Sequence, residues 1–101
     1  MREGLFMRLV YFDKSRLSTE DNTVFDIRYY LTVDDIVCGE ALLFENYGIF
    51  IEILKDDQII ETEMLPGITP FLSTIEDIAN IAAGNAVTPS TIKDVVLDYL
   101  S

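Results

Sequence analysis

Residues 24–33, with the sequence VFDIRYYLTV, alternate between two kinds of side chain, and this stretch decides the fold class. One face carries Phe25, Ile27, Tyr29, Leu31 and Val33, whereas the other carries Asp26, Arg28, Tyr30 and Thr32. A period of two with one apolar face is typical of an antiparallel strand that is buried on one side. We therefore expect a sheet with one face covered by another layer.

Strand patterns continue on both sides of this stretch. The sequence predicts strands at about residues 5–12, 24–33, 36–45, 49–54 and 59–65, with a polar loop over residues 14–23. Asp34-Asp35 and residues 55–58 have turn composition, and residues 45–48 fit either a turn or a kink in one long strand. These turns would place Val33 opposite Ile36 and Glu52 opposite Glu61.

The C-terminal third changes to helical periodicity. Two Thr-Pro pairs, Thr69-Pro70 and Thr88-Pro89, have the form of an N-cap followed by proline at the first helical position. The apolar spacing after them predicts helices at about residues 70–83 and 89–100, with Gly84-Asn85 as a left-handed end to the first. Residues 1–101 are thus expected to form a single α+β domain. Its antiparallel sheet has four to five strands, followed by two C-terminal helices packed on one face.

Composition excludes several kinds of chemistry. The 101 residues include 18 Asp and Glu, 7 Lys and Arg, one Cys and no His, for a net charge of −11. Without His, the chain has no His-based catalysis or metal ligation, so we expect no enzyme, cofactor or metal site. Cys38, expected to be a small buried residue, fits a reducing cytoplasm. The negative charge disfavours direct binding to nucleic acid or membranes, and no stretch is long enough to span a membrane.

One group of residues on the last two predicted strands forms a candidate partner surface. Three carboxylates lie beside large apolar side chains on one predicted sheet face: Phe50, Glu52, Leu54, Ile59, Glu61 and Glu63, with Leu65 next to them. Such a face could bind a protein through an apolar patch with an acidic rim. Three other interpretations stay open: the face could be covered by another part of the chain, its carboxylates could simply face solvent, or they could bind a cation.

Three functional hypotheses follow from these features. The first is a non-enzymatic protein-interaction module that binds a protein partner or self-associates. The second is an acidic mimic of nucleic acid that inhibits a basic DNA- or RNA-binding protein, which requires a continuous band of carboxylates. The third is a carboxylate cation-binding site at Glu52, Glu61 and Glu63.

The C-terminal region also carries a family resemblance. The segments Tyr47-Gly48-Ile49 and Ile-Thr-Pro, together with the tail Asn85-Ala86-Val87-Thr88-Pro89 and Ile92-x-Asp94-Val95-Val96-x-Asp98-x-Leu100, resemble a small clostridial family. The resemblance spans roughly residues 24–100, and that family is a domain of unknown function. It implies a bacterial (Firmicutes), cytoplasmic origin and no particular activity.

Overall fold

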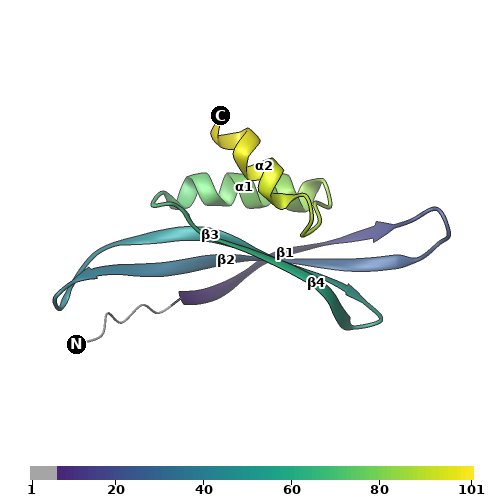
Figure 1. Cartoon of the computed structure of the whole chain (residues 1–101), viewed down its shortest axis with the longest axis horizontal. Coiled ribbons are helices and arrows are strands. Elements are labelled where there is room, and N and C mark those ends of the chain that lie inside the picture. Colours follow the sequence, from purple (N-terminus) through teal and green to yellow (C-terminus); the bar gives the residue numbers. More distant parts are fainter. Residues whose placement is uncertain (1–6) are drawn as a thin grey trace.

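The computed structural model describes residues 7–101 as one antiparallel sheet with two helices on one side (Figure 1). The strands are β1 (Met7–Ser18), β2 (Val24–Cys38), β3 (Ala41–Lys55) and β4 (Gln58–Thr69), and they lie side by side in chain order. The helices α1 (Leu72–Gly84) and α2 (Ile92–Leu100) follow. This architecture confirms the predicted α+β class. None of the described helices has the length and apolar character needed to cross a membrane.

The core lies between the helices and the middle of the sheet. The residues predicted for the apolar face of β2 do face the helices, and Ile27 and Tyr29 are 0% exposed. Ile49 and Ile51 of β3 and Ile75 and Ile78 of α1 complete the contact. We call this side the helix-covered face and the opposite side the open face.

The helices cover only part of the sheet. Thirteen residues of α1 span about 20 Å at 1.5 Å per residue. Fifteen residues of β2 span about 50 Å at 3.3 Å per residue, and the molecule measures 54 × 30 × 17 Å. Both ends of the sheet therefore extend beyond the helices, as Figure 1 shows.

The predicted turn at Asp34-Asp35 is wrong. Both residues lie inside β2, where Asp34 pairs with Asn46 and Asp35 with Glu45. The chain turns instead at Gly39-Glu40, where Gly39 has φ +64°. Glycine adopts this left-handed conformation without a steric cost, so it favours the later turn. Residues 45–48 accordingly continue one long strand, which is one of the two predicted alternatives, and the described residues form a sheet of four strands, within the predicted four to five.

Several predicted boundaries also move. The loop expected at residues 14–23 shrinks because β1 continues to Ser18, and β4 continues through Pro66-Gly67 to Thr69. Residues 5 and 6 of the first predicted strand lie outside the described residues. The helices begin later than the Thr-Pro pairs predict, at Leu72 and Ile92, and neither N-cap makes a side-chain hydrogen bond. The left-handed end of the first helix was predicted at Gly84-Asn85. In the structure, the residue with positive φ after α1 is Ala86 (φ 51°).

Gly48 of β3 lies where another part of the backbone crosses the open face. A Cβ atom at this position would lie 2.2 Å from the carbonyl oxygen of Leu65 and 2.6 Å from both Pro66 Cα and Thr32 Oγ1. The irregular part of β4 around Pro66-Gly67 therefore passes directly over Gly48. No larger residue fits this crossing without moving backbone atoms.

Candidate interaction surfaces

The predicted partner surface does not lie on one face of the sheet. Asp56 and Asp57 both have positive φ, so a two-residue turn pairs Lys55 with Gln58 and Leu54 with Ile59, as the sequence predicts. The register then shifts, and Ile53 pairs with Glu61. Compared with the predicted pairing, this shift of one residue places every side chain of β4 from Glu61 onward on the opposite face of the sheet.

This shift separates the three predicted carboxylates. Glu52 pairs with Thr62 on the open face, whereas Glu61 and Glu63 pair with Ile53 and Ile51 on the helix-covered face. The predicted Glu52–Glu61 pairing is therefore wrong, and the geometric basis for a shared cation site is lost. Among residues 7–101, no group of three or more Asp, Glu or Cys side chains is arranged to hold a metal ion.

The apolar members of the predicted surface have different environments. Phe50 is half-buried on the open face, Leu54 is 2% exposed, and Ile59 is 53% exposed near the end of the β3–β4 hairpin. Leu65 packs at the margin of the central core. Of the six predicted residues, Phe50, Glu52, Leu54 and Ile59 share the open face, and Leu54 is too buried to contact a partner.

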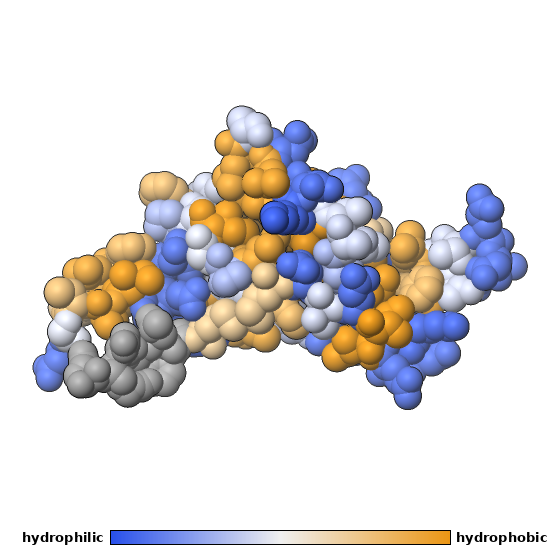
Figure 2. All heavy atoms as spheres, viewed as in Figure 1, coloured by the Kyte–Doolittle hydropathy of each residue, from blue (hydrophilic) through white to orange (hydrophobic). Residues whose placement is uncertain are grey.

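The end of the sheet formed by β2 and β3 carries a larger apolar surface. We call residues 34–46 the β2–β3 arm. Its apolar side chains remain accessible, since Val37, Leu42, Leu43 and Phe44 are 40%, 57%, 60% and 45% exposed. Cys38 is also exposed there, contrary to the prediction of a buried residue, because it is next to the turn. Figure 2 shows hydrophobic residues gathered at this end of the molecule.

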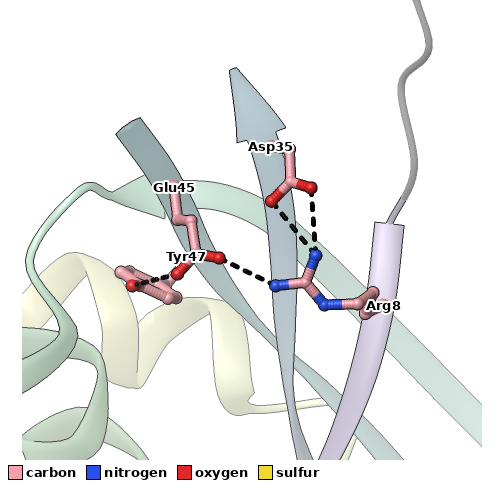
Figure 3. A network of polar contacts seen from close by, with 4 residues as sticks. All are labelled: Arg8, Asp35, Glu45 and Tyr47. Carbon is pink, nitrogen blue, oxygen red and sulfur yellow. Dashed lines mark hydrogen bonds and ion pairs between the residues drawn. The ribbon is translucent and has the colours of Figure 1, made fainter. Parts of the chain in front are cut away.

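A network of polar contacts spans the base of the arm (Figure 3). Arg8 of β1 donates through Nη1 to both carboxylate oxygens of Asp35 at 3.1 Å and through Nη2 to Oε2 of Glu45 at 2.9 Å. Tyr47 Oη donates to Oε1 of Glu45 at 2.9 Å. The single guanidinium thus connects β1 to acidic residues on β2 and β3.

The charges of this network affect one another. The pKa of the Arg8 guanidinium is raised by its hydrogen bonds to Glu45 and Asp35. The pKa of the Tyr47 hydroxyl is raised by its hydrogen bond to Glu45, because the hydroxyl donates only while it is protonated. Both donors, Arg8 and Tyr47, therefore keep their protons at neutral pH. The network separates the apolar end of the arm from the buried core.

The open face carries a second accessible group, made of aromatic side chains. Tyr11 and Tyr30 meet edge to face, with ring centroids 5.7 Å apart, and Tyr30 and Phe50 are 5.6 Å apart. Phe50 pairs with Met64 on β4, so the group crosses all four strands. We call Tyr11, Tyr30, Phe50 and Met64 the aromatic band.

Polar groups flank the aromatic band on the side away from the arm. Tyr30 Oη donates to Oε1 of Glu52 at 3.0 Å, and Arg28 Nη1 lies 3.9 Å from the same oxygen. The pKa of the Tyr30 hydroxyl is raised by burial and then by its bond to Glu52. A shallow hollow beside this pair is lined by Lys14, Ser15, Arg16, Asp26 and Arg28.

Sequence reasoning missed the arm and most of the aromatic band. A signal for the arm exists in residues 36–44, IVCGEALLF, because apolar residues occupy successive positions and so both faces of a strand. Tyr11, Tyr30 and Phe50 are far apart in the sequence, and they meet only through the strand register. Lys14 and Arg16 were expected in a loop, so their place on the sheet face was not predicted.

Comparison with known proteins adds a family but no activity. A family model described as "Family of unknown function (DUF6514)" matches residues 8–101. No curated protein and no solved structure matches the chain. The match confirms the predicted resemblance to a domain of unknown function, and it extends that resemblance to the first strand.

Proposed function

We propose that this chain, which belongs to the DUF6514 family of unknown function, is a non-enzymatic protein-interaction module that binds a protein partner through the β2–β3 arm. The observation that supports this most directly is the accessible apolar surface of the arm beyond the polar network of Arg8. Exposed apolar patches of this kind mark contact sites more often than they serve a monomer.

The arm has the composition of an interface with a polar rim. Its apolar side chains stand beside Asp34, Asp35, Glu40 and Glu45, and residues 34–46 contain no Lys or Arg. Interfaces commonly combine an apolar centre with a polar border. The complementary partner is therefore a protein with an apolar groove bordered by basic side chains.

The non-enzymatic part of the proposal rests on the available side chains. The chain has no His, and its one Cys is at the exposed end of the arm. The cytoplasmic, clostridial setting implied by the sequence resemblance belongs to the same proposal, as does the absence of direct contact with nucleic acid or membrane. An exposed thiol is compatible with a reducing compartment.

The nucleic-acid mimic is the weaker alternative. It requires a continuous band of free carboxylates, whereas Asp35 and Glu45 pair with Arg8 and Asp26 pairs with Arg16. These acids also lie on both faces of the sheet. The arm, in contrast, would bind chiefly through apolar contact.

Affinity capture from a lysate of the native host with three forms of the full chain tests the proposal. We compare wild type with Leu43→Asp in the arm and with Leu97→Asp on α2, since Leu43 and Leu97 are 60% and 55% exposed. We expect a partner to be retained by wild type and Leu97→Asp and lost by Leu43→Asp. Equal retention by all three forms would contradict the arm as the contact site. Retention of a basic protein that only salt releases would favour the mimic.

A further inference from the structure

The outer edge of β3 is paired along only part of its length. Over residues 47–55, β3 lies between β2 and β4. The last pair with β4 joins Tyr47 to Thr69, after which the chain leaves the sheet to begin α1 at Leu72. Residues 41–46 therefore pair with β2 alone, and within residues 7–101 no further backbone hydrogen bond reaches them. We call the side of residues 41–46 that is away from β2 the arm edge.

An unpaired strand edge determines the conformation of the segment that binds it. Its free N–H and C=O groups can be satisfied by one more strand, at a spacing of about 4.8 Å. The six residues of the arm edge span about 20 Å at 3.3 Å per residue, which is the length of a typical strand. Because β4 occupies the same edge up to Thr69, an added strand would lie in line with β4.

The side chains along the arm edge are apolar on both faces of the arm. Leu42, Leu43 and Phe44 are 57%, 60% and 45% exposed. Phe44 pairs with Ile36 and Leu42 with Val37, and these two partners are adjacent on β2, so they point to opposite faces. An added strand would therefore have apolar neighbours on both of its faces. The matching sequence is a run of successive apolar residues, as in strands that are buried on both sides.

The charge of the arm adds a second property of the occupant. Residues 34–46 carry four carboxylates, and among residues 7–101 Arg8 is the one cation that pairs with them. One guanidinium balances one of the four negative charges, so the arm keeps a net charge of −3. Glu40 lies in the turn at one end of the arm edge. Basic residues beside the apolar run would be attracted, whereas a second copy of this acidic chain would be repelled.

We propose that the arm binds its partner by strand addition. The wall of the partner's apolar groove contains an extended segment of about five successive apolar residues, flanked by Lys or Arg, that pairs with the arm edge antiparallel to β3. Main-chain hydrogen bonds then supply affinity, and the side chains on the two faces specify the sequence. This inference rests on the proposed function, because it states how the partner of the arm is recognised.

One irregularity of the arm limits where the new hydrogen bonds form. Val37 pairs with Leu42 and Ile36 with Phe44, so Leu43 is the extra residue of a bulge. A bulge interrupts the regular alternation of outward N–H groups and weakens pairing at an edge. From residue 44 to residue 46 the pairing of β3 with β2 is regular again. The new hydrogen bonds should therefore be concentrated at residues 44–46, next to the end of β4.

Hydrogen exchange of single amides, followed by NMR, tests strand addition. The probe is the peptide Lys-Val-Ile-Val-Tyr-Val-Lys, extended by Gly-Ser-Gly-Cys and joined through that cysteine to Cys38, which is exposed and is the only cysteine of the chain. Such a short tether gives an effective concentration of about 1 mM, so that even a weak probe can pair. We expect the outward amides of residues 44–46 to exchange at least about tenfold more slowly than without the probe, and those bonded to β2 to change less.

Two further probes are matched controls. The same tethered peptide with every apolar residue N-methylated keeps its side chains but cannot donate to the arm edge, so it should give no protection. A probe with Glu in place of both Lys should protect about fivefold less, as expected for exposed charges. Equal protection by the Glu probe would contradict the basic flanks.

Three results would overturn strand addition itself. They are no protection by the first probe, equal protection by the N-methylated probe, and protection in the free chain that increases with its concentration, which would show a second copy at the edge. The proposed function fails differently. Capture that does not depend on Leu43 would contradict the arm as the contact site. If capture depends on Leu43 and the first probe gives no protection, only strand addition is contradicted.

Discussion

The centre of the sheet and the β2–β3 arm are built from the same kinds of residue but have different environments. In the centre, Ile49 and Ile51 of β3 are 0% exposed beneath the helices. Only a few residues earlier on the same strand, Leu42 and Leu43 are 57% and 60% exposed. The difference arises from the cover and not from the strand, because the helices are shorter than the sheet. Apolar residues on one strand can therefore stabilise the fold at one end and remain available for binding at the other.

The largest expected difference between the two regions is in stability. Ile51→Ala should lower the free energy of unfolding by about 2–5 kcal/mol, because it leaves a cavity in the core. Leu43→Ala in the arm should change it by less than about 0.5 kcal/mol, as at other exposed positions. Urea unfolding followed by circular dichroism measures both. Equal losses would show that the arm contributes to the core, and the comparison would fail.

Gly48 tests the boundary between the two regions. Gly48→Ala should cost about 3 kcal/mol, the upper part of the range for overpacking, because the new methyl group meets backbone atoms of Leu65 and Pro66. Gly84→Ala is the matched control, since its Cβ would have no neighbour within 4 Å. The same urea titration should show Gly84→Ala as neutral or slightly stabilising. If Gly48→Ala left the free energy of unfolding unchanged, the backbone of β4 would not approach β3 as closely at this point as the structure shows.

Tyr29 gives a smaller effect within the centre. Its hydroxyl donates to the backbone oxygen of Val87 at 2.8 Å, which ties the sheet to the segment before α2. Tyr29→Phe should cost about 1 kcal/mol through loss of this hydrogen bond. Thermal unfolding at pH 7 measures the cost.

Tyr29 should also make the folding stability depend on pH. Burial raises the pKa of Tyr29 from 10.0 to about 12. A pKa that is higher in the folded state stabilises the protein below pH 10, and this contribution is lost as the pH rises to 12. Wild type should therefore lose stability more steeply between pH 10 and 12 than Tyr29→Phe does. Parallel curves for the two proteins would contradict this assignment.

The smallest effect is expected at the base of the arm. Arg8→Gln removes both ion pairs, but they are exposed and screened by solvent, so the midpoint of global unfolding should hardly change. The effect should be local, with faster hydrogen exchange at amides of residues 34–46 and unchanged exchange in the centre. Uniformly faster exchange would indicate that Arg8 supports the whole sheet.

Sequence patterns predicted the fold class better than the contact surfaces. The alternation along residues 24–33 and the helical spacing of Ile75 and Ile78 follow from local geometry, and both were confirmed. The turn between β2 and β3 was misplaced because Asp34-Asp35 and Gly39-Glu40 both have turn composition. Only the pairing of the complete strands distinguishes them.

The candidate surfaces depend on still longer-range information. One irregular step in the pairing beside Ile53 and Leu54 moves Glu61 and Glu63 away from Glu52. Nothing in the local sequence marks that step, because an extra residue in a strand is accommodated by its neighbours. The aromatic band requires residues from all four strands, so it could be recognised only after the register was known.

The exposed position of Cys38 has a practical consequence. It is the only cysteine in the chain, and it lies at the end of the arm, away from the core. A fluorescent maleimide can therefore label the native sequence at a single known point without mutagenesis. Its emission would report directly on whether the arm is free or occupied, which provides a binding assay before any ligand has been identified.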